Sequence, residues 1–173
     1  MLSGGGTIRQ LFGCPVYPSP HHVSRSNRCY GLRLYDKGEG MDNVTLLKNL
    51  YHAFGRGDMP VVLGGMSPDI KWHQAEGSPY MPSGEPWVGP DAILNNLFMK
   101  LGAEWDGFSV HPKLFHGAGD SVIVEARYSG TYKATGKSMD AQVCHVWDVK
   151  DGKVTRFQQY VDTAKIQDVM GTR

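Results

Sequence analysis

The chain has 173 residues, 40% hydrophobic and 20% charged, with a formal net charge of +1, which is typical of one ordinary globular domain. It contains no basic run or patch, which argues against a nucleic-acid partner, and no apolar stretch of the roughly 20 residues that a transmembrane helix needs. Its three cysteines are dispersed and form no Cys-x-x-Cys zinc or redox site, so we expect a reducing cytoplasm, no disulfide framework and no metal.

Residues 1–40 differ from the rest of the chain. They are rich in Gly, Pro, Ser and Arg, and they carry five Lys and Arg against two Asp and Glu, a charge of 5 − 2 = +3. Such a segment buries too little apolar surface to offset its ordering entropy, which predicts disorder or docking on a neighbour. A second hypothesis is that Met41 is the natural start and 1–40 is translated leader, because Lys37-Gly-Glu39 back-translates to a purine-rich run like a bacterial ribosome-binding site. Under either hypothesis the folded domain spans 41–173.

The domain is expected to begin with two helices and a strand. Leucines and aromatic residues at three- and four-residue spacing predict an amphipathic helix over 42–55. Asp58 and Pro60 suit the first turn of a short second helix that ends near Leu63. The stretch Asp69-Ile-Lys-Trp-His-Gln-Ala75 then alternates as a strand.

A loop, a third helix and four strands are expected to follow. Four prolines and three glycines predict a loop over 77–90, which lies over the surface or at a pocket mouth, and apolar spacing predicts a helix over 91–101. The strand-like runs lie near 107–115, 121–133, 139–149 and 153–162. Glycine-containing turns separate these runs, so neighbours should pair antiparallel, and Asp162-Thr163 should open a short terminal helix. This order predicts an α+β fold with helices gathered on one face of a curved antiparallel sheet.

Four short motifs stand in an order and spacing that are more specific than any one of them. They are Tyr51-His-Ala-Phe-Gly-Arg-Gly-Asp58, Asp69-Ile-Lys-Trp-His73, Gly89-Pro-Asp-Ala-Ile93 and Asp151-Gly-Lys-Val154. Together they make residues 43–170 resemble the SnoaL-like, ketosteroid-isomerase-like branch of the nuclear-transport-factor-2-like superfamily. The resemblance implies a cone-shaped, cystatin-like α+β barrel, with helices on the concave face of a curved mixed sheet around one apolar pocket. It also implies a homodimer through the outer sheet face. Because no Gly-x-Gly-x-x-Gly or Walker loop is present, no cofactor is expected.

The catalytic groups of these relatives do not carry over to this chain. Ketosteroid isomerases use a carboxylate base on the first strand, and a tyrosine plus a protonated aspartic acid as oxyanion donors. Laid on this sequence, these positions fall at Gln74, Leu50 and Cys144, and the acid/base aspartate of SnoaL-like cyclases falls at Gln159. Tyr51 is adjacent to the tyrosine position but about 100° around the helix from it. Glutamine takes no proton near neutral pH, so steroid-type enolisation is not expected, although such a pocket can still bind and polarise a carbonyl.

Strand alternation selects candidate pocket residues on the first strand. If Gln74 faces the pocket, Trp72 and Glu76 face it too, while Lys71 and His73 face outward. Glu76 beside aromatic surfaces can act as a base with a raised pKa, or it is a solvated residue at the strand end. His73 becomes a base only if a bulge inverts the strand.

Another candidate base lies in the long strand before the Asp-Gly turn. His145 and Trp147 share one face of this strand, and the hairpin alignment places that face outside, opposite Arg156, Gln158 and Tyr160. An aromatic, Arg-containing outer face suits a dimer interface. A register shift of one residue would instead bring His145 into the pocket and make it the leading acid/base candidate.

We therefore predict a cytoplasmic homodimer that encloses a small apolar molecule, with isomerase, cyclase or lyase activity by acid/base chemistry on a carbonyl-type substrate. The candidate catalytic residues are Glu76, His73 and His145. The candidate ligand-binding residues are Tyr51, Trp72, Gln74, Tyr80, Trp87, Cys144 and Gln159, of which Tyr80 and Trp87 form a loop lid or pack over the core. The alternative is a non-catalytic ligand-binding or protein-interaction module of the same fold.

Overall fold

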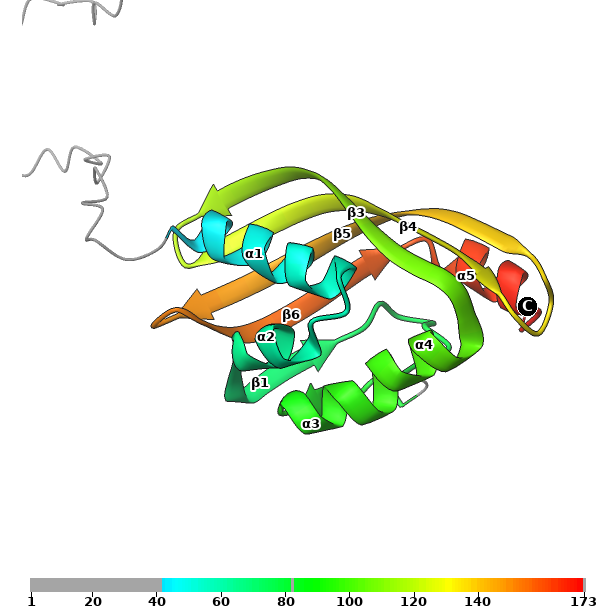
Figure 1. Ribbon diagram of the computed structural model, residues 1–173, viewed down its shortest axis with the longest axis horizontal. Helices are drawn as coiled ribbons and strands as arrows, with labels where there is room; N and C mark the ends of the chain where they lie inside the picture. The colour runs from blue at the N-terminus through cyan, green and yellow to red at the C-terminus, as the bar shows by residue number, and fades with distance from the viewer. Residues whose placement is uncertain (1–41, 82, 173) are drawn as a thin grey trace, which may run out of the picture. The chain divides into compact units, whose positions relative to one another are not determined.

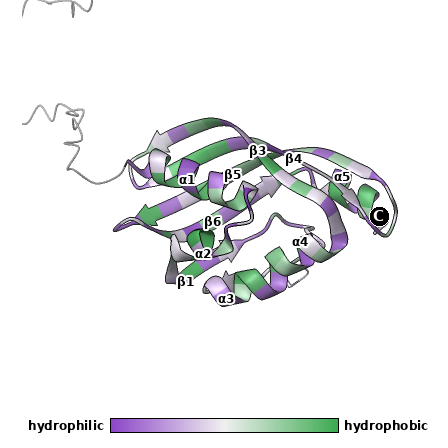
Figure 2. Cartoon of the chain, in the orientation of Figure 1, coloured by the Kyte–Doolittle hydropathy of each residue, from purple (hydrophilic) through white to green (hydrophobic). Residues whose placement is uncertain are grey.

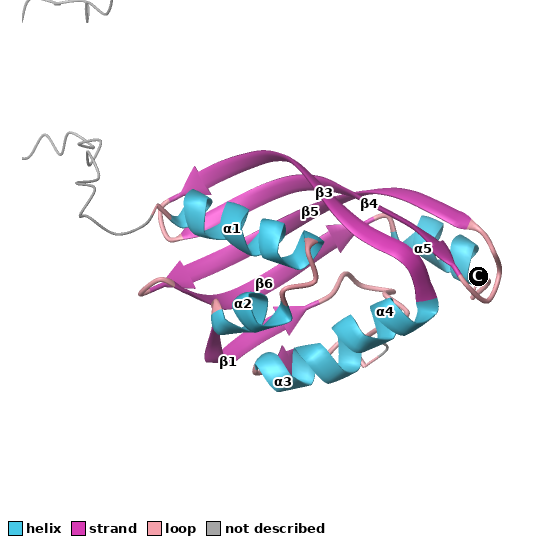
Figure 3. Cartoon of the chain, viewed as in Figure 1, coloured by secondary structure: helices cyan, strands magenta, loops and turns pink. Residues whose placement is uncertain are grey.

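The computed structural model describes residues 42–81 and 83–172, which form one mixed sheet with helices on one of its faces (Figures 1 and 3). The hypotheses about residues 1–40 fall outside this described range. In chain order the elements are α1 (Asn43–Gly55), α2 (Met59–Gly64), β1 (Met66–His73), β2 (Trp87–Val88), α3 (Pro90–Ile93), the π-helical η1 (Leu94–Phe98), α4 (Met99–Glu104), β3 (Trp105–Ala118), β4 (Ser121–Tyr132), β5 (Ser138–Lys150), β6 (Lys153–Val161) and α5 (Thr163–Met170).

The order of strands in the sheet is β2-β1-β6-β5-β4-β3. β1 and β6 are parallel, and the other neighbours are antiparallel. Helix α1 packs on β3 and β4, while α2 and α3 pack on β1 and α5 packs on β5 (Figure 1). The predicted α+β fold with a curved mixed sheet is confirmed. In the part of the chain described, the sheet is open rather than closed into a barrel, because β2 and β3 form its two edges.

Local sequence signals begin and end the short helices as expected. Asp58 caps α2, since its Oδ1 accepts a hydrogen bond of 3.4 Å from the amide of Val61. Asp162 caps α5 in the same way, and accepts 3.0 Å from the amide of Lys165. Gly171 ends α5 in the left-handed conformation, which glycine adopts without a Cβ clash. The roles predicted for Asp58 and Asp162 at helix starts are therefore confirmed.

Strand β5 separates the core from the outer surface by strict alternation. Its odd-numbered residues are buried on the face that the helices cover: Met139, Ala141, Val143, His145, Trp147 and Val149. The even-numbered residues alternate with them on the other face, and Figure 2 shows this change of hydropathy along the strands. Phe157 of β6 completes the core and is 1% exposed.

A β-bulge in the β5–β6 hairpin sets which residues face the core. Lys150 pairs with Lys153 and Val149 with Val154, but Asp148 then pairs with Arg156, so Thr155 is the extra residue. The bulge shifts the register by one beyond this point. The expectation that His145 and Trp147 face outward opposite Arg156, Gln158 and Tyr160 is therefore wrong. His145 pairs with Gln159 and Trp147 with Phe157, and both face inward.

Candidate functional site

A cavity of about 80 Å³ lies between the inner face of the sheet and the helices. This volume is well below the roughly 300 Å³ at the lower end of small-molecule sites. Its walls are mainly aromatic and aliphatic side chains. The polar side chains that line it are Tyr51, Gln74, Ser78, Tyr80, Tyr128, His145 and Gln159. No Asp, Glu, Lys or Arg is among the described residues that line the cavity.

His145 lies at the centre of the polar groups in this cavity. Its side chain is 3% exposed, and each ring nitrogen makes a hydrogen bond with a tyrosine. The hydroxyl of Tyr51 lies 2.6 Å from Nδ1, and the hydroxyl of Tyr128 lies 2.6 Å from Nε2. Because both nitrogens are engaged, a bound molecule would meet the imidazole through the tyrosines rather than directly.

Each of the two tyrosines also accepts a hydrogen bond from an N–H group. Trp147 Nε1 donates to the Tyr51 hydroxyl at 3.0 Å, and Gln159 Nε2 donates to the Tyr128 hydroxyl at 2.8 Å. The Gln159 amide cannot be turned round, because its Oε1 accepts 3.2 Å from the backbone amide of Ala75, which is only a donor. Helix α1 and strands β4, β5 and β6 thus bring together a hydrogen-bonded chain of five side chains: Trp147, Tyr51, His145, Tyr128 and Gln159.

Burial keeps the ionisable members of this chain neutral. It lowers the pKa of His145 to about 3, because the buried site removes the water that stabilises an imidazolium. It raises the pKa of Tyr51 and of Tyr128, although the hydrogen bonds from Trp147 and Gln159 act in the opposite direction. An imidazole of this kind is a weak proton acceptor near neutral pH and acts as a hydrogen-bond relay.

Aromatic rings build the rest of the wall. Trp72 stacks on Phe157 with ring centroids 3.8 Å apart, and Trp147 lies 4.4 Å from Phe157. Phe98, which the π-helical segment η1 carries, contacts Trp72 at 5.5 Å and Phe54 at 5.4 Å. Such contacts favour flat, apolar ligand surfaces.

Two polar groups in this wall have no hydrogen-bond partner among the described residues. The indole N–H of Trp72 is fully buried and unpaired. The side-chain amide of Gln74, a residue that is 9% exposed, is likewise without a partner in the described part of the chain. Because Gln74 lines the cavity, its amide marks a place where a bound molecule or water can bind, whereas the indole N–H of Trp72 has no exposed surface toward the cavity.

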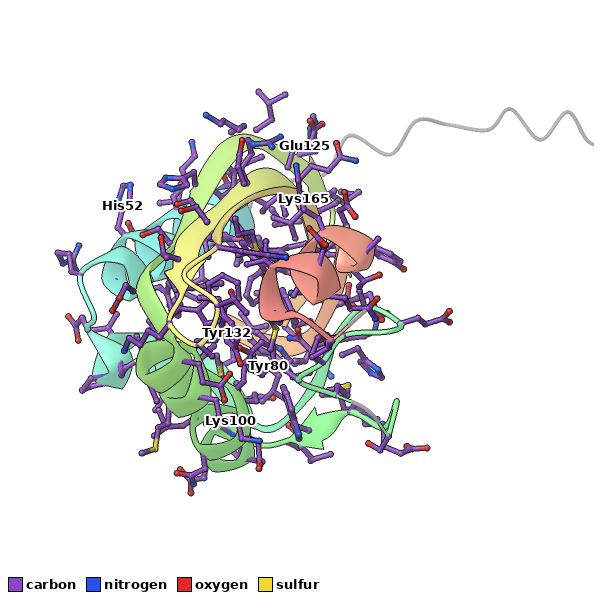
Figure 4. All side chains as sticks on the ribbon, turned by 90° about the vertical axis from the view of Figure 1, so that its right-hand side faces the viewer. His52, Tyr80, Lys100, Glu125, Tyr132 and Lys165 are labelled. Atoms are coloured by element: carbon purple, nitrogen blue, oxygen red, sulfur yellow. The ribbon has the colours of Figure 1, made fainter. Side chains whose placement is uncertain are left out.

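The Pro/Gly-rich loop reaches the cavity through Tyr80. The Tyr80 hydroxyl donates 2.8 Å to Glu104 Oε2 and accepts 2.7 Å from Trp105 Nε1. Burial raises the pKa of Tyr80, which is therefore a neutral phenol. In an end view Tyr80 lies toward the middle of the molecule near Tyr132, whereas Lys100 lies at its periphery (Figure 4). These bonds hold the loop at the junction of α4 and β3.

The structure brings together six of the ten residues that the sequence selected. Those that line the cavity are Tyr51, Trp72, Gln74, Tyr80, His145 and Gln159. The other four do not line it. Glu76 is exposed beyond the end of β1, and Trp87 lies in edge strand β2, paired with the backbone of Trp72. Neither side chain lines the pocket; the structure agrees with the alternatives, in which Glu76 is a solvated residue at the strand end and Trp87 packs over the core.

The remaining two candidates face away from the helices. His73 points outward because β1 alternates regularly from Ile70 to Gln74, and no bulge inverts it there. Burial and the nearby Arg156 lower its pKa. Cys144 lies on the outer sheet face opposite Tyr160. The prediction that it lines the pocket is therefore wrong, because the bulge that turns His145 inward turns Cys144 outward.

The sequence analysis missed Tyr128 and the role of Trp147 as a hydrogen-bond donor. Tyr128 follows Val122, Val124 and Ala126 at two-residue spacing on β4, and this alternation predicts an inward side chain.

In the part of the chain described, no cluster of three or more His, Cys, Asp or Glu side chains could hold a metal ion. No described helix is long and apolar enough to cross a membrane.

Several known structures share this fold. An NTF2-like protein from Burkholderia thailandensis E264 is 36% identical, with a TM-score of 0.71 over 76% of this chain and 98% of that one. An NTF2-like protein of unknown function from Burkholderia pseudomallei K96243 is 25% identical, with a TM-score of 0.67 over 75% and 98%. TerC, co-crystallised with polyporic acid, is 26% identical, with a TM-score of 0.67 over 75% and 98%.

No match was found among curated proteins. The model of the SnoaL-like domain family matches residues 47–157, which include strands β1 to β5, the first half of β6 and most of the cavity wall. The chain therefore belongs to the SnoaL-like domain family, and its fold is that of the NTF2-like and ketosteroid-isomerase-like proteins.

Proposed function

We propose that this domain binds one small, largely apolar molecule with a carbonyl-type oxygen and acts on it by proton transfer, as an isomerase, cyclase or related lyase. The observation that carries the proposal is the placement of His145 between Tyr51 and Tyr128 in the wall of an apolar cavity. The family and TerC, which was co-crystallised with an organic molecule, support the class of ligand.

The cavity limits both the size of the ligand and the chemistry. A volume of about 80 Å³ suits a molecule of only a few heavy atoms unless wall side chains move. Since the described lining contains no carboxylate and His145 stays neutral, a free charge in the cavity would be poorly solvated. We therefore favour a concerted relay that keeps the cavity neutral: one tyrosine gives its O–H proton to the carbonyl oxygen and receives the N–H proton of His145. The other tyrosine gives its O–H proton to the second nitrogen of His145 and takes the proton from the carbon next to the carbonyl, so the ligand becomes its enol and His145 changes tautomer.

Solvent deuterium exchange tests this proposal. Butanone and cyclopentanone are incubated with the protein in D₂O, and deuterium uptake at the carbon next to the carbonyl is followed by NMR. We expect exchange above the buffer rate, and a loss of roughly 100-fold in His145→Gln. The matched control is His116→Gln, which removes an exposed histidine of the outer surface.

The two named functions give different results in this experiment. Ketone binding without exchange would favour the alternative, a non-catalytic binding module. Absence of both binding and exchange would count against the proposal, and equal exchange in the wild type and His145→Gln would remove His145 from the mechanism.

A further inference from the structure

The protons of the Tyr51–His145–Tyr128 chain can be counted from its hydrogen bonds. A phenol has one O–H to donate, and its oxygen can accept. A neutral imidazole donates from one nitrogen and accepts at the other. His145 is neutral, because it is buried among Tyr51, Tyr128, Trp147 and Phe157, and none of the described residues that line the same cavity is charged.

The two tyrosine partners of the neutral imidazole must have opposite hydrogen-bond roles. One tyrosine donates its O–H to the unprotonated nitrogen of His145, and the other accepts the N–H of the protonated nitrogen. Trp147 and Gln159 add one N–H donor to each tyrosine oxygen, and neither can act as an acceptor there. The tyrosine that accepts from His145 therefore receives two N–H bonds, and its own O–H has no acceptor among the described residues.

We infer that the cavity presents one unpaired tyrosine O–H, from Tyr51 or Tyr128 according to the tautomer of His145, and that this donor selects ligands with an uncharged oxygen acceptor such as the carbonyl of a small ketone. The inference rests on the proposed function, and it names the group that touches the ligand. Two N–H bonds to a phenol oxygen polarise its O–H and strengthen the bond that it donates.

The rest of the wall fits the same class of ligand. The side-chain amide of Gln74 lines the cavity, has no hydrogen-bond partner among the described residues, and can donate as well. The stacked rings of Trp72 and Phe157 suit a flat apolar body. A carboxylate ligand is disfavoured, because the described lining offers no cation to pair with it.

The tautomer is measured first, in the full-length protein labelled with ¹⁵N-histidine. We expect one protonated and one unprotonated ring nitrogen for His145 between pH 5 and pH 8. Two protonated nitrogens would overturn the inference, because an imidazolium would donate to both tyrosines. This measurement needs no variant, so it stands even if a tyrosine replacement fails to fold.

Binding of butanone is then compared with that of 2-methyl-1-butene, which has the same shape but no oxygen acceptor. We expect the wild type to bind the ketone about tenfold more tightly, as one good hydrogen bond allows. If Nδ1 carries the proton, Tyr51→Phe should abolish this preference and Tyr128→Phe should keep it. If Nε2 carries the proton, the two variants should exchange these results. Tyr160→Phe on the outer face is the control.

The outcomes separate this inference from the proposed function. Equal binding of ketone and alkene to the wild type would leave the cavity as a binding site but overturn the unpaired donor. A preference that survives in both tyrosine variants would also overturn it. If neither molecule binds, both the inference and the binding site proposed for the cavity fail.

Discussion

The two faces of strand β5 place neighbouring residues in very different surroundings. On the inner face, His145 is hydrogen-bonded to two neutral tyrosines and surrounded by aromatic rings. On the outer face, Asp148 pairs with Arg156 at 3.4 Å and Asp140 pairs with Arg127 at 2.6 Å, all within reach of water. Alternation along one strand thus separates a site where charge is suppressed from a surface where charge is paired.

The largest expected difference between the two faces is in packing. Phe157→Ala should lower the free energy of unfolding by about 3–5 kcal/mol, because it leaves a cavity among fully buried rings. Phe157 lies 3.8 Å from Trp72 and 4.4 Å from Trp147, centroid to centroid. Urea unfolding at pH 7 measures this loss.

Tyr160→Ala is the matched control, since it removes an aromatic ring from the other face of the same strand. Tyr160 is 58% exposed, so its loss should change the free energy of unfolding by only about 0.5 kcal/mol. Similar losses for the two variants would show that the outer face of β6 is as well packed as the inner one.

The free energy of unfolding should also depend on pH through His145, and this effect is smaller. The folded-state pKa of His145 is about 3, below its ordinary value of 6.5, so between these values the unfolded chain binds a proton that the folded chain does not. The contribution of His145 to stability is therefore complete above pH 6.5 and is lost as the pH falls toward 3. Between pH 7 and pH 5 the loss should be about 2 kcal/mol.

Urea unfolding of the wild type and His145→Gln at both pH values isolates this effect. The variant should lose about 2 kcal/mol less than the wild type on acidification. His116→Gln should behave like the wild type, because His116 pairs with Glu125 on the exposed surface. If His145→Gln were as sensitive to acid as the wild type, His145 would not be the buried neutral group described above.

The fold and half of the site could be predicted from the sequence, since both depend on local patterns. Two-residue alternation placed Trp72 and Gln74 inward, and the Asp-Gly turn placed the hairpin. The predicted pairing register of β5 and β6 beyond Thr155 was wrong, because an extra residue in one strand exchanges the two faces of the residues that follow it. The spacing of three between Val154 and Phe157 was a signal of the bulge, and so was the apolar alternation that includes Trp147.

Other parts of the site depend on contacts that no local pattern reports. Tyr128 meets His145 only because β4 and β5 pair with their inner faces aligned, and Tyr80 reaches Glu104 only through the path of a long loop. Alternation alone could place Tyr128 on the inner face, but it could not identify its partner. A chain of hydrogen bonds across three strands and a helix requires the tertiary structure.

The smallest expected effect concerns the ion pair of Arg156 and Asp148. Both side chains are more than a third exposed, and their coupling energy in a double-alanine cycle should be only about 0.5 kcal/mol. High salt should weaken it further, because the screening length falls from about 10 Å at 0.1 M to 3 Å at 1 M. A coupling several times larger that depended on protein concentration would instead indicate that a second copy covers this face. The homodimer through the outer sheet stays a prediction, and this cycle measured at two protein concentrations tests it on the residues that such an interface would bury.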